Sequence, residues 1–108
     1  MLPPHLRPPL SALRDGLAAV FGERLREVRL FGSYARGEAN EHSDVDALVL
    51  IDGLAPGEVA AVSDVATQVA LKFDILLAPL PLSAAAFAQM LVSGRRLARD
   101  IQQQGASL

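Results

Sequence analysis

The chain has 108 residues, 51% of them hydrophobic, no cysteine and a formal net charge of −2 at pH 7. This length fits one domain with a real core, while the absence of cysteine excludes disulfides and thiolate metal sites. The slight negative charge argues against non-specific binding of nucleic acid through a broad basic face. No apolar run is long enough to span a bilayer and no signal-peptide pattern opens the sequence, so we expect a cytoplasmic protein.

The N-terminal third of the chain predicts an arm, a helix and a strand. Residues 1–9 hold four of the seven prolines and are expected to form an extended arm before a single domain over residues 10–108. From Leu10 to Gly22 apolar residues recur at helical spacing, and the glycine suits the end of the helix. From Leu25 to Phe31 apolar and polar residues alternate and then become wholly apolar, which predicts a first strand.

The middle of the chain predicts a turn, a second strand and a second helix. After a Gly-Ser break, Tyr34 to Gly37 can make one helical turn, and Glu38 to Ser43 forms a polar loop. The long apolar run from Asp44 to Ile51 predicts a strand buried on both faces. Glu58 to Leu71 carries an apolar face rich in valine, which indicates a helix that packing must stabilise.

The C-terminal third predicts a third strand followed by helices. Residues Phe73 to Ala78 form an apolar run that Pro79 and Pro81 are expected to stop. Ser83 is a suitable N-cap for a further helix, and Arg95 to Gln104 continues in helical spacing. The resulting order of helices and strands predicts a small α/β fold with three or four strands and helices packed on the sheet.

Two aspartates, Asp44 and Asp46, open the second predicted strand. Residues two apart on a strand point to the same face, so the two carboxylates repel each other unless a cation lies between them. Oxygen ligands of this kind suit Mg²⁺ or Mn²⁺. The alternative is that an Asp-x-Asp sequence is only a turn or a cap, but here it leads into an apolar strand.

Asp74 is the third candidate because it lies within an apolar run. An unpaired charge in a buried strand costs several kcal/mol, and a place beside the other two aspartates on a neighbouring strand would explain it. The sequence therefore indicates a site of three carboxylates.

Gly32 and Ser33 follow the end of the first strand, as phosphate-binding loops do. Glycine allows the backbone to approach an anion, and successive amides form a concave donor site. Arg36 lies three residues later and can neutralise phosphate charge. Each feature has a simpler alternative, because Gly-Ser is a common turn and Arg36 can be a solvated surface residue. The sequence is not a Walker loop, since no Gly-Lys-Ser/Thr follows.

Together these residues resemble the nucleotidyltransferase superfamily of polymerase-β type. Its signature is Gly-Ser, a short spacer, Asp-x-Asp and a third carboxylate on a later strand. In this chain Gly-Ser at 32–33 is followed by ten residues, by Asp-Val-Asp at 44–46 and then by Asp74. The stretch Gly-Ser-Tyr-Ala-Arg-Gly-Glu-Ala is similar to the small stand-alone members called minimal nucleotidyltransferases. The resemblance covers residues 25–105 and implies a small mixed β-sheet with helices packed on it.

The resemblance also implies roles for the site residues. In the family the Gly-Ser pair holds the triphosphate of a nucleotide such as ATP, with an arginine at the position of Arg36 often nearby. The first two aspartates, here Asp44 and Asp46, bind Mg²⁺ or Mn²⁺ and the nucleotide. The third, here Asp74, completes the metal site and helps to activate the attacking hydroxyl. The implied reaction transfers a nucleoside monophosphate, AMP from ATP, to a hydroxyl acceptor.

The resemblance further implies a partner. Small members of the family are frequently paired with a helical ribonuclease toxin of the HEPN type, which the nucleotidyltransferase modifies as an antitoxin. Two alternatives remain open at this point: a partner-binding module without catalysis, and an enzyme that modifies a small molecule such as an antibiotic, as a homo-oligomer. The apolar segment from Leu80 to Leu91 can be core or a partner surface. His42, Glu38 and Glu41 are expected to be solvated loop residues, and His5 has no assigned role.

Overall fold

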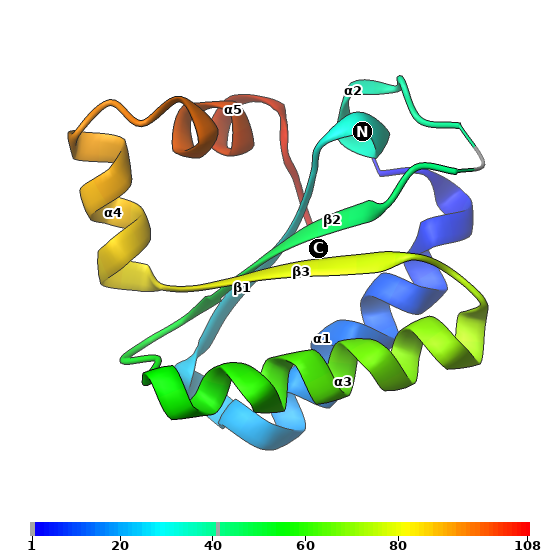
Figure 1. Ribbon diagram of the computed structural model, residues 1–108, viewed down its shortest axis with the longest axis horizontal. Coiled ribbons are helices and arrows are strands. Elements are labelled where there is room, and N and C mark those ends of the chain that lie inside the picture. Colours follow the sequence, from blue (N-terminus) through cyan, green and yellow to red (C-terminus); the bar gives the residue numbers. More distant parts are fainter. Residues whose placement is uncertain (1, 41) are drawn as a thin grey trace.

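The computed structural model describes residues 2–40 and 42–108, and Glu41 therefore lies outside the described residues. A four-stranded sheet forms the middle layer, with two helices packed on one face and two on the other (Figure 1). Short 3₁₀ turns lie at Pro4–Leu6, Gly22–Arg24 and Pro56–Glu58. The helices are α1 (Arg7–Phe21), α2 (Ser33–Arg36), α3 (Val59–Phe73), α4 (Ala84–Val92) and α5 (Arg96–Gln104). The strands are β1 (Leu25–Phe31), β2 (Val45–Ile51), β3 (Leu77–Ser83) and β4 (Ala106–Ser107).

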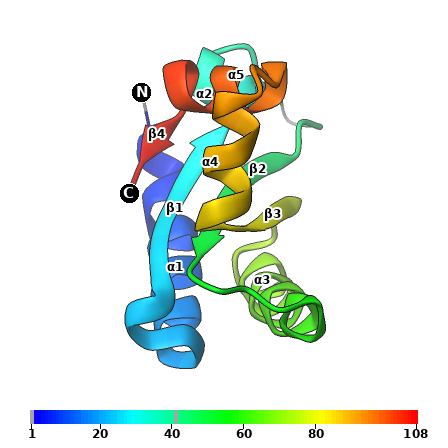
Figure 2. The same ribbon diagram turned by 90° about the vertical axis from the view of Figure 1, so that its left-hand side faces the viewer.

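The strand order is β3-β2-β1-β4, so β2 lies inside the sheet and β3 forms one open edge (Figure 2). β1 is antiparallel to both β2 and β4, whereas β3 runs parallel to β2. The expected mixed sheet with packed helices is therefore confirmed, with four strands. The two strands predicted first by the hydrophobic pattern, β1 and β2, are neighbours in this sheet.

Alternate residues of β2 face two different cores. Val45, Ala47, Val49 and Ile51 are buried against α1 and α3. Leu48 and Leu50 face the opposite side, where they pack with Ile101 of α5 and Phe87 of α4. Every residue of β2 except Asp46 is buried, which confirms the prediction of a strand covered on both faces. The single partly exposed position on this strand is thus an aspartate.

The prediction of a third strand at 73–78 is wrong. Phe73 is the last residue of α3, and β3 begins at Leu77 and continues through Pro79 and Pro81. The carbonyl of Leu76 accepts the Val45 N–H at 2.7 Å, so the even-numbered residues of β3 bond to β2. The two prolines are odd-numbered, and their nitrogens face the open edge, where no ladder donor is needed.

The extended arm predicted for residues 1–9 is also wrong from Pro4 onwards. Pro4–Leu6 forms a 3₁₀ turn, and α1 begins at Arg7. Its second and third residues are prolines, which cost no hydrogen bond there because the first four N–H groups of a helix lack an acceptor within it. Leu6 is only 1% exposed and belongs to the core beneath the sheet. Burial of Leu6 is what holds this segment against the domain.

The predicted ends of the C-terminal helices agree with the structure. The Ser83 hydroxyl accepts the Ala86 N–H at 3.0 Å and caps α4, and Gly105 ends α5. In the segment from Leu80 to Leu91, which the sequence left open between core and partner surface, Leu80, Leu82 and Phe87 pack partly buried against the core, although no residue of α4 is fully buried. Within residues 2–40 and 42–108, no helix has the length and apolar character that a membrane crossing requires.

An arginine and a glutamate hold together the turns at the far end of the sheet. The Arg24 guanidinium donates to both carboxylate oxygens of Glu58, at 2.8 and 2.7 Å, and to the carbonyls of Asp52 and Gly53. Glu58 also accepts the Ala55 N–H at 3.0 Å. The hydrogen bonds from Arg24 and Ala55 lower the pKa of Glu58 from 4.5 to about 2.

This shift predicts how the stability of a Glu58→Gln variant depends on pH. A carboxylate whose pKa falls on folding stabilises the fold fully above its unfolded pKa, and this stabilisation disappears as the pH falls through the native value. We expect the variant to melt below the wild type at pH 7, with the difference shrinking between about pH 4.5 and 2. Thermal melts followed by circular dichroism at several pH values measure this difference in melting temperature.

Glu23→Gln is the matched control, because Glu23 is an exposed glutamate in the adjacent 3₁₀ turn. It should melt with the wild type at both ends of the pH range. A Glu58→Gln deficit that stays constant from pH 7 to pH 2 would contradict the assignment of the ion pair.

Candidate functional site

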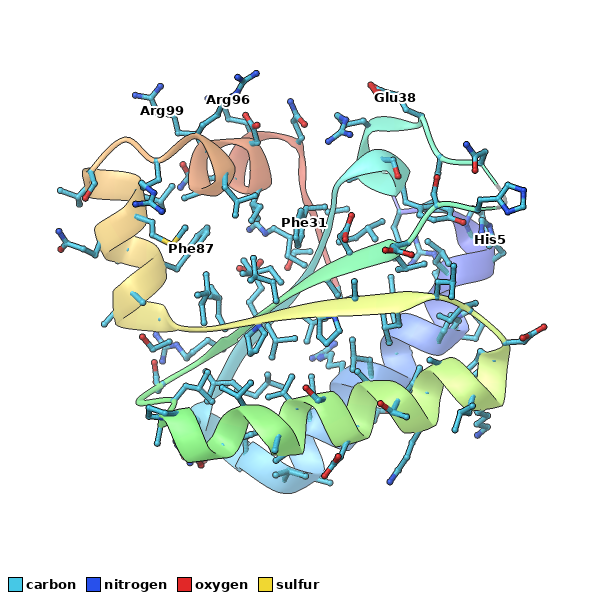
Figure 3. All side chains as sticks on the ribbon, in the orientation of Figure 1. His5, Phe31, Glu38, Phe87, Arg96 and Arg99 are labelled. Carbon is cyan, nitrogen blue, oxygen red and sulfur yellow. The ribbon has the colours of Figure 1, made fainter. Side chains whose placement is uncertain are left out.

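The pair of aspartates lies on the face of the sheet that carries α4 and α5. Asp44 directly precedes β2 and Asp46 is its second residue. Asp46 is in phase with Leu48 and Leu50, which pack against α4 and α5. The helices cover the two leucines, whereas Asp44 is exposed and Asp46 is only partly buried. Phe31 is the register partner of Asp46 on β1 and lies beside it on this face (Figure 3). The carboxylates therefore stand at the uncovered end of the sheet.

The two carboxylates affect each other electrostatically. Burial and the negative charge of Asp44 raise the pKa of Asp46, and the positive charge of Arg36 opposes this rise. An ionised Asp46 is therefore less favourable in the fold than in water, and a cation between the two carboxylates would relieve the repulsion. Two carboxylates on one strand face are donors that fit Mg²⁺ or Mn²⁺. The prediction that Asp44 and Asp46 lie together is consistent with this geometry.

Gly32 brings the turn after β1 against Asp46. Its backbone angles are φ 75° and ψ −153°, a region that is essentially restricted to glycine. A Cβ on Gly32 would overlap the Oδ2 atom of Asp46. The Cα of Gly32 is thus packed against the carboxylate, and no larger residue fits. This contact fixes the Gly-Ser turn and the carboxylate pair relative to each other.

Ser33 begins α2, the single helical turn that follows Gly32. The amides in the first turn of a helix have no carbonyl acceptor within it and point away from the chain. The carbonyls of Gly32 and Ser33 accept the N–H groups of Arg36 and Glu38, at 3.2 and 2.9 Å, which closes the turn. The turn thus presents helix-start amides next to Asp46, and the binding of phosphate oxygens by Gly32 and Ser33 stays a prediction.

Arg36 is the last residue of α2 and supplies positive charge to this site. Its Nε atom lies 3.4 Å from the Glu38 carboxylate. It also acts electrostatically on Asp46, as the direction of its effect on that pKa shows. Glu38 is an exposed loop residue, as expected, and its carboxylate pairs with the guanidinium that acts on the Asp46 carboxylate.

The loop between α2 and β2 is closed by short-range hydrogen bonds. The Asn40 N–H donates to the Ser43 hydroxyl at 3.0 Å, and the Ser43 N–H donates to the Asn40 carbonyl at 3.1 Å. The backbone N–H of His42 donates to the Asn40 side chain at 2.8 Å. His42 is exposed, as expected, and these bonds define the approach of the chain to Asp44.

Asp74 is not brought to the other two aspartates as a third ligand. It is the C-cap of α3 in the left-handed conformation, with φ 53°, and its side chain is exposed. Among the described residues no group of three histidine, aspartate or glutamate side chains is placed to hold a metal ion. The apolar run 75–78 suggested a strand around Asp74, whereas the residue lies in the link before β3.

Asp74 instead lines a hollow of about 250 Å³ that the sequence did not reveal. His5, Tyr34 and Ser43 line the same hollow, and the rings of His5 and Tyr34 meet edge to face with centroids 6.0 Å apart. Figure 3 shows His5 at the end of the sheet where β2 begins. The hollow therefore adjoins the backbone of Asp44. No sequence signal marks His5, because the prolines on either side of it predict an extended arm and not the helical start that places it.

The family of the chain is shown by a match over residues 10–85 to the model of the nucleotidyltransferase domain. The chain belongs to this family. The resemblance to the polymerase-β-type superfamily and to its minimal members is confirmed, and the matched region contains the Gly-Ser turn and all three candidate aspartates.

Two similar proteins with assigned names are both called protein adenylyltransferases. A protein of Methanocaldococcus jannaschii, named provisionally a protein adenylyltransferase, is 35% identical over 66% of this chain and 73% of its own length. The protein adenylyltransferase MntA of Thermococcus cleftensis is 55% identical over 37% of this chain and 38% of its own length.

Solved structures show the same fold. A crystal structure of a toxin–antitoxin complex with AMP-PNP matches with a TM-score of 0.60 and 25% identity, over 88% of this chain and 68% of that one. A crystal structure of a mutant of the toxin–antitoxin pair MntA-HpeT matches with a TM-score of 0.58 and 27% identity, over the same two shares. The fold of this chain is therefore that of proteins solved in toxin–antitoxin complexes.

Proposed function

We propose that the chain is a protein adenylyltransferase, which transfers AMP from ATP to a hydroxyl of a partner protein and acts as the antitoxin of a toxin–antitoxin pair. The observation that carries the proposal is the packing of Gly32 against the Asp46 carboxylate. This contact joins a phosphate-type donor turn to a carboxylate pair that favours a cation. Family membership supports the reaction, and the names of the relatives support the acceptor class.

Each part of the site has a proposed task. The amides at Gly32 and Ser33, with the guanidinium of Arg36, bind the β- and γ-phosphates of ATP. Asp44 and Asp46 are the residues that would hold Mg²⁺ or Mn²⁺. The metal would supply neutralisation of the negative charge on the phosphate oxygens during transfer. Most of the remaining catalysis is positioning, because phosphoryl-type transfer requires little covalent participation by the protein.

In the proposed reaction the acceptor oxygen forms a bond to the α-phosphorus of ATP. The bond from that phosphorus to the oxygen bridging to the β-phosphate breaks, and pyrophosphate leaves. The hydroxyl proton passes to a carboxylate. We assign that role to Asp74 rather than a place in the metal site, because Asp74 is separate from the pair and lines the same hollow as Ser43 at this end of the sheet.

A variant separates these two roles of Asp74. Asp74→Asn keeps a residue that tolerates the left-handed conformation and removes the proton acceptor. We expect the turnover rate to fall about 100-fold or more, as is usual when a general base is lost. Binding of Mn²⁺ and AMP-PNP, measured calorimetrically, should be unchanged. A loss of Mn²⁺ affinity would instead make Asp74 a metal ligand.

The proposed partner is a helical toxin of the HEPN type. The resemblance to minimal nucleotidyltransferases suggests this class, and similar solved structures are toxin–antitoxin complexes. Neither Asp44 nor Asp46 lines the hollow of about 250 Å³ at this end of the sheet, and Asp44 is exposed. An acceptor group presented by another protein fits such an open site better than a free small molecule.

Transfer of label from α-³²P-ATP tests the proposal. The assay contains Mg²⁺ and the co-expressed protein encoded beside this chain, and it compares the wild type with the double variant Asp44→Ala/Asp46→Ala. Label on the partner that disappears in the variant is the expected result. Equal partner binding by both forms without any label would replace the proposal with a non-catalytic antitoxin, and label on a small molecule would replace it with an antibiotic-type enzyme.

A further inference from the structure

We propose that the acceptor protein docks on the open β3 edge of the sheet, through an apolar surface formed by Ala70, Leu71, Leu76, Leu77 and Pro79. We call this the β3-edge surface. The inference rests on the proposed transfer of AMP to a protein, and it adds where that protein binds and which chemistry it must present. The geometry around Asp46 indicates from which side the acceptor hydroxyl approaches. The exposed leucines indicate the surface on which the acceptor protein docks.

The direction from which the acceptor hydroxyl approaches follows from the position of the turn at Gly32 and Ser33. Gly32 and α2 lie on the β1 side of Asp46, because Gly32 continues β1 and touches the Asp46 carboxylate. The leaving pyrophosphate is therefore held on the β1 side. In-line displacement requires the attacking oxygen to lie opposite the leaving oxygen. The acceptor hydroxyl must then approach from the other side of β2, which is the side of β3.

The β3 side of Asp46 is open. Ala78 is the register partner of Asp46 on β3, so the residue directly opposite the aspartate carries only a methyl group. β3 is the last strand of the sheet among the described residues, and no further strand covers it. A group on another protein can thus reach Asp46 across Ala78.

The β3 edge carries exposed apolar side chains. Leu71 is 79% exposed at the end of α3, and Leu76 is 60% exposed just before β3. Between α3 and β3 lies a hollow of about 310 Å³, lined by Ala70, Leu71, Leu77 and Pro79 among others. None of its lining side chains is charged. Exposed leucines beside an uncharged hollow are typical of a protein interface and not of a nucleic-acid surface.

The two prolines of β3 restrict how the partner binds. Pro79 and Pro81 have no N–H to offer at the open edge, so a partner strand cannot continue the ladder there. The partner must bind through side chains, as an apolar face of a helix does in a groove. We therefore expect an apolar helix of the acceptor protein in the hollow between α3 and β3. Leu77 and Pro79 pair with Val45 and Ala47, so this hollow lies on the α3 face of the sheet, and the modified hydroxyl must reach over the β3 edge to the face that carries Asp46.

A second exposed surface lies at the opposite end of the molecule. Val92 at the end of α4 is 84% exposed, and Figure 3 shows Arg96 and Arg99 pointing outward from α5 nearby. α4 follows Ser83, whose register partner is Ile51 at the far end of β2. The five-residue span from Asp46 to Ile51, about 17 Å, separates this end of β2 from Asp46. A partner bound only there would not reach the carboxylates.

The test uses Leu71→Asp and Leu76→Asp, with Val92→Asp as the matched control at the other surface. AMP-PNP binding with Mn²⁺, affinity for the co-expressed partner protein and label transfer from α-³²P-ATP are measured for each. We expect both edge variants to bind AMP-PNP like the wild type and to bind the partner at least about 10-fold more weakly. Their KM for the partner should rise with little change in kcat, and Val92→Asp should match the wild type.

The outcomes separate this inference from the proposed function. A wild-type chain that does not bind AMP-PNP or transfer AMP overturns the proposed function, and the docking site with it. Label on the partner that the edge variants leave unchanged, or that Val92→Asp alone reduces, overturns only the docking site. Label found in RNA, or a wild-type dimer that the edge variants dissociate, overturns it in favour of a nucleic-acid partner or a second copy.

Discussion

Replacement of Asp46 by asparagine is expected to reduce AMP transfer at least about a thousand-fold, because charge neutralisation at the reacting phosphate is worth several kcal/mol. The same variant should be more stable than the wild type when no divalent metal is present. Burial and Asp44 both raise the pKa of Asp46, so its ionised form destabilises the fold. Asparagine has nearly the same shape and no charge. Loss of activity with a gain in stability identifies a residue whose charge serves binding.

The pH dependence of this gain has a definite sign. Because the native pKa of Asp46 lies above its ordinary value of 3.8, the folded state holds a proton that the unfolded state has lost in the window between the two values. Stability of the wild type therefore decreases as the pH rises through this window. The melting temperature of Asp46→Asn should exceed that of the wild type by an amount that grows above about pH 4 and stays constant near neutral pH.

Divalent metal should reverse the order of stability. A ligand that binds only the folded state stabilises it by RT ln(1 + [L]/Kd), so Mn²⁺ well above its Kd should raise the melting temperature of the wild type by several degrees and leave Asp46→Asn unchanged. Asp64→Asn is the control, because Asp64 is an exposed aspartate on α3. An Asp46→Asn variant that still gains stability from Mn²⁺ would show that the carboxylate pair is not the metal site.

The part of the site that local sequence determines could be predicted. Gly32, Ser33, Asp44 and Asp46 lie at the ends of two strands whose hydrophobic patterns are unambiguous, and β1 and β2 pair directly. Strand period alone puts the two aspartates on one face. Such features depend on neighbours in the sequence, and the structure places them as the pattern indicates.

The position of β3 could not be predicted in the same way. The run Phe-Asp-Ile-Leu-Leu-Ala has the composition of a strand, but α3 continues to Phe73 and Asp74 ends it with a positive φ. Prolines such as Pro79 and Pro81 argue against a strand only where neighbouring strands hydrogen-bond to it on both sides. An edge strand has a neighbouring strand on one side only. Which strand lies at an edge is a property of the whole sheet, so the local pattern could not supply it.

The N-terminal segment illustrates the same limit. Prolines at 3, 4, 8 and 9 suggest an extended chain, yet prolines are equally acceptable in the first turn of a helix. What decides between these is the burial of Leu6 against the sheet, a tertiary contact. The ring contact between His5 and Tyr34 follows from it. The hollow that contains Asp74 was therefore not foreseeable, since its walls come from distant segments of the chain.

Gly32→Ala is expected to have the second large effect, on both stability and transfer. Alanine in the backbone conformation of Gly32 costs about 1–3 kcal/mol, and its Cβ must displace the Asp46 carboxylate. A displacement of about 1 Å can reduce a rate about 100-fold. We therefore expect at least that loss in label transfer, together with a lowered melting temperature.

Two further glycines separate the contact with Asp46 from backbone strain. Gly57→Ala meets no atom within 4 Å at an ordinary φ, and should leave stability and transfer unchanged. Gly37→Ala has a positive φ but also open space around the new Cβ, so it should lower stability and retain transfer. If Gly37→Ala loses transfer as completely as Gly32→Ala, backbone strain in the loop is sufficient and the contact with Asp46 is not what positions the site.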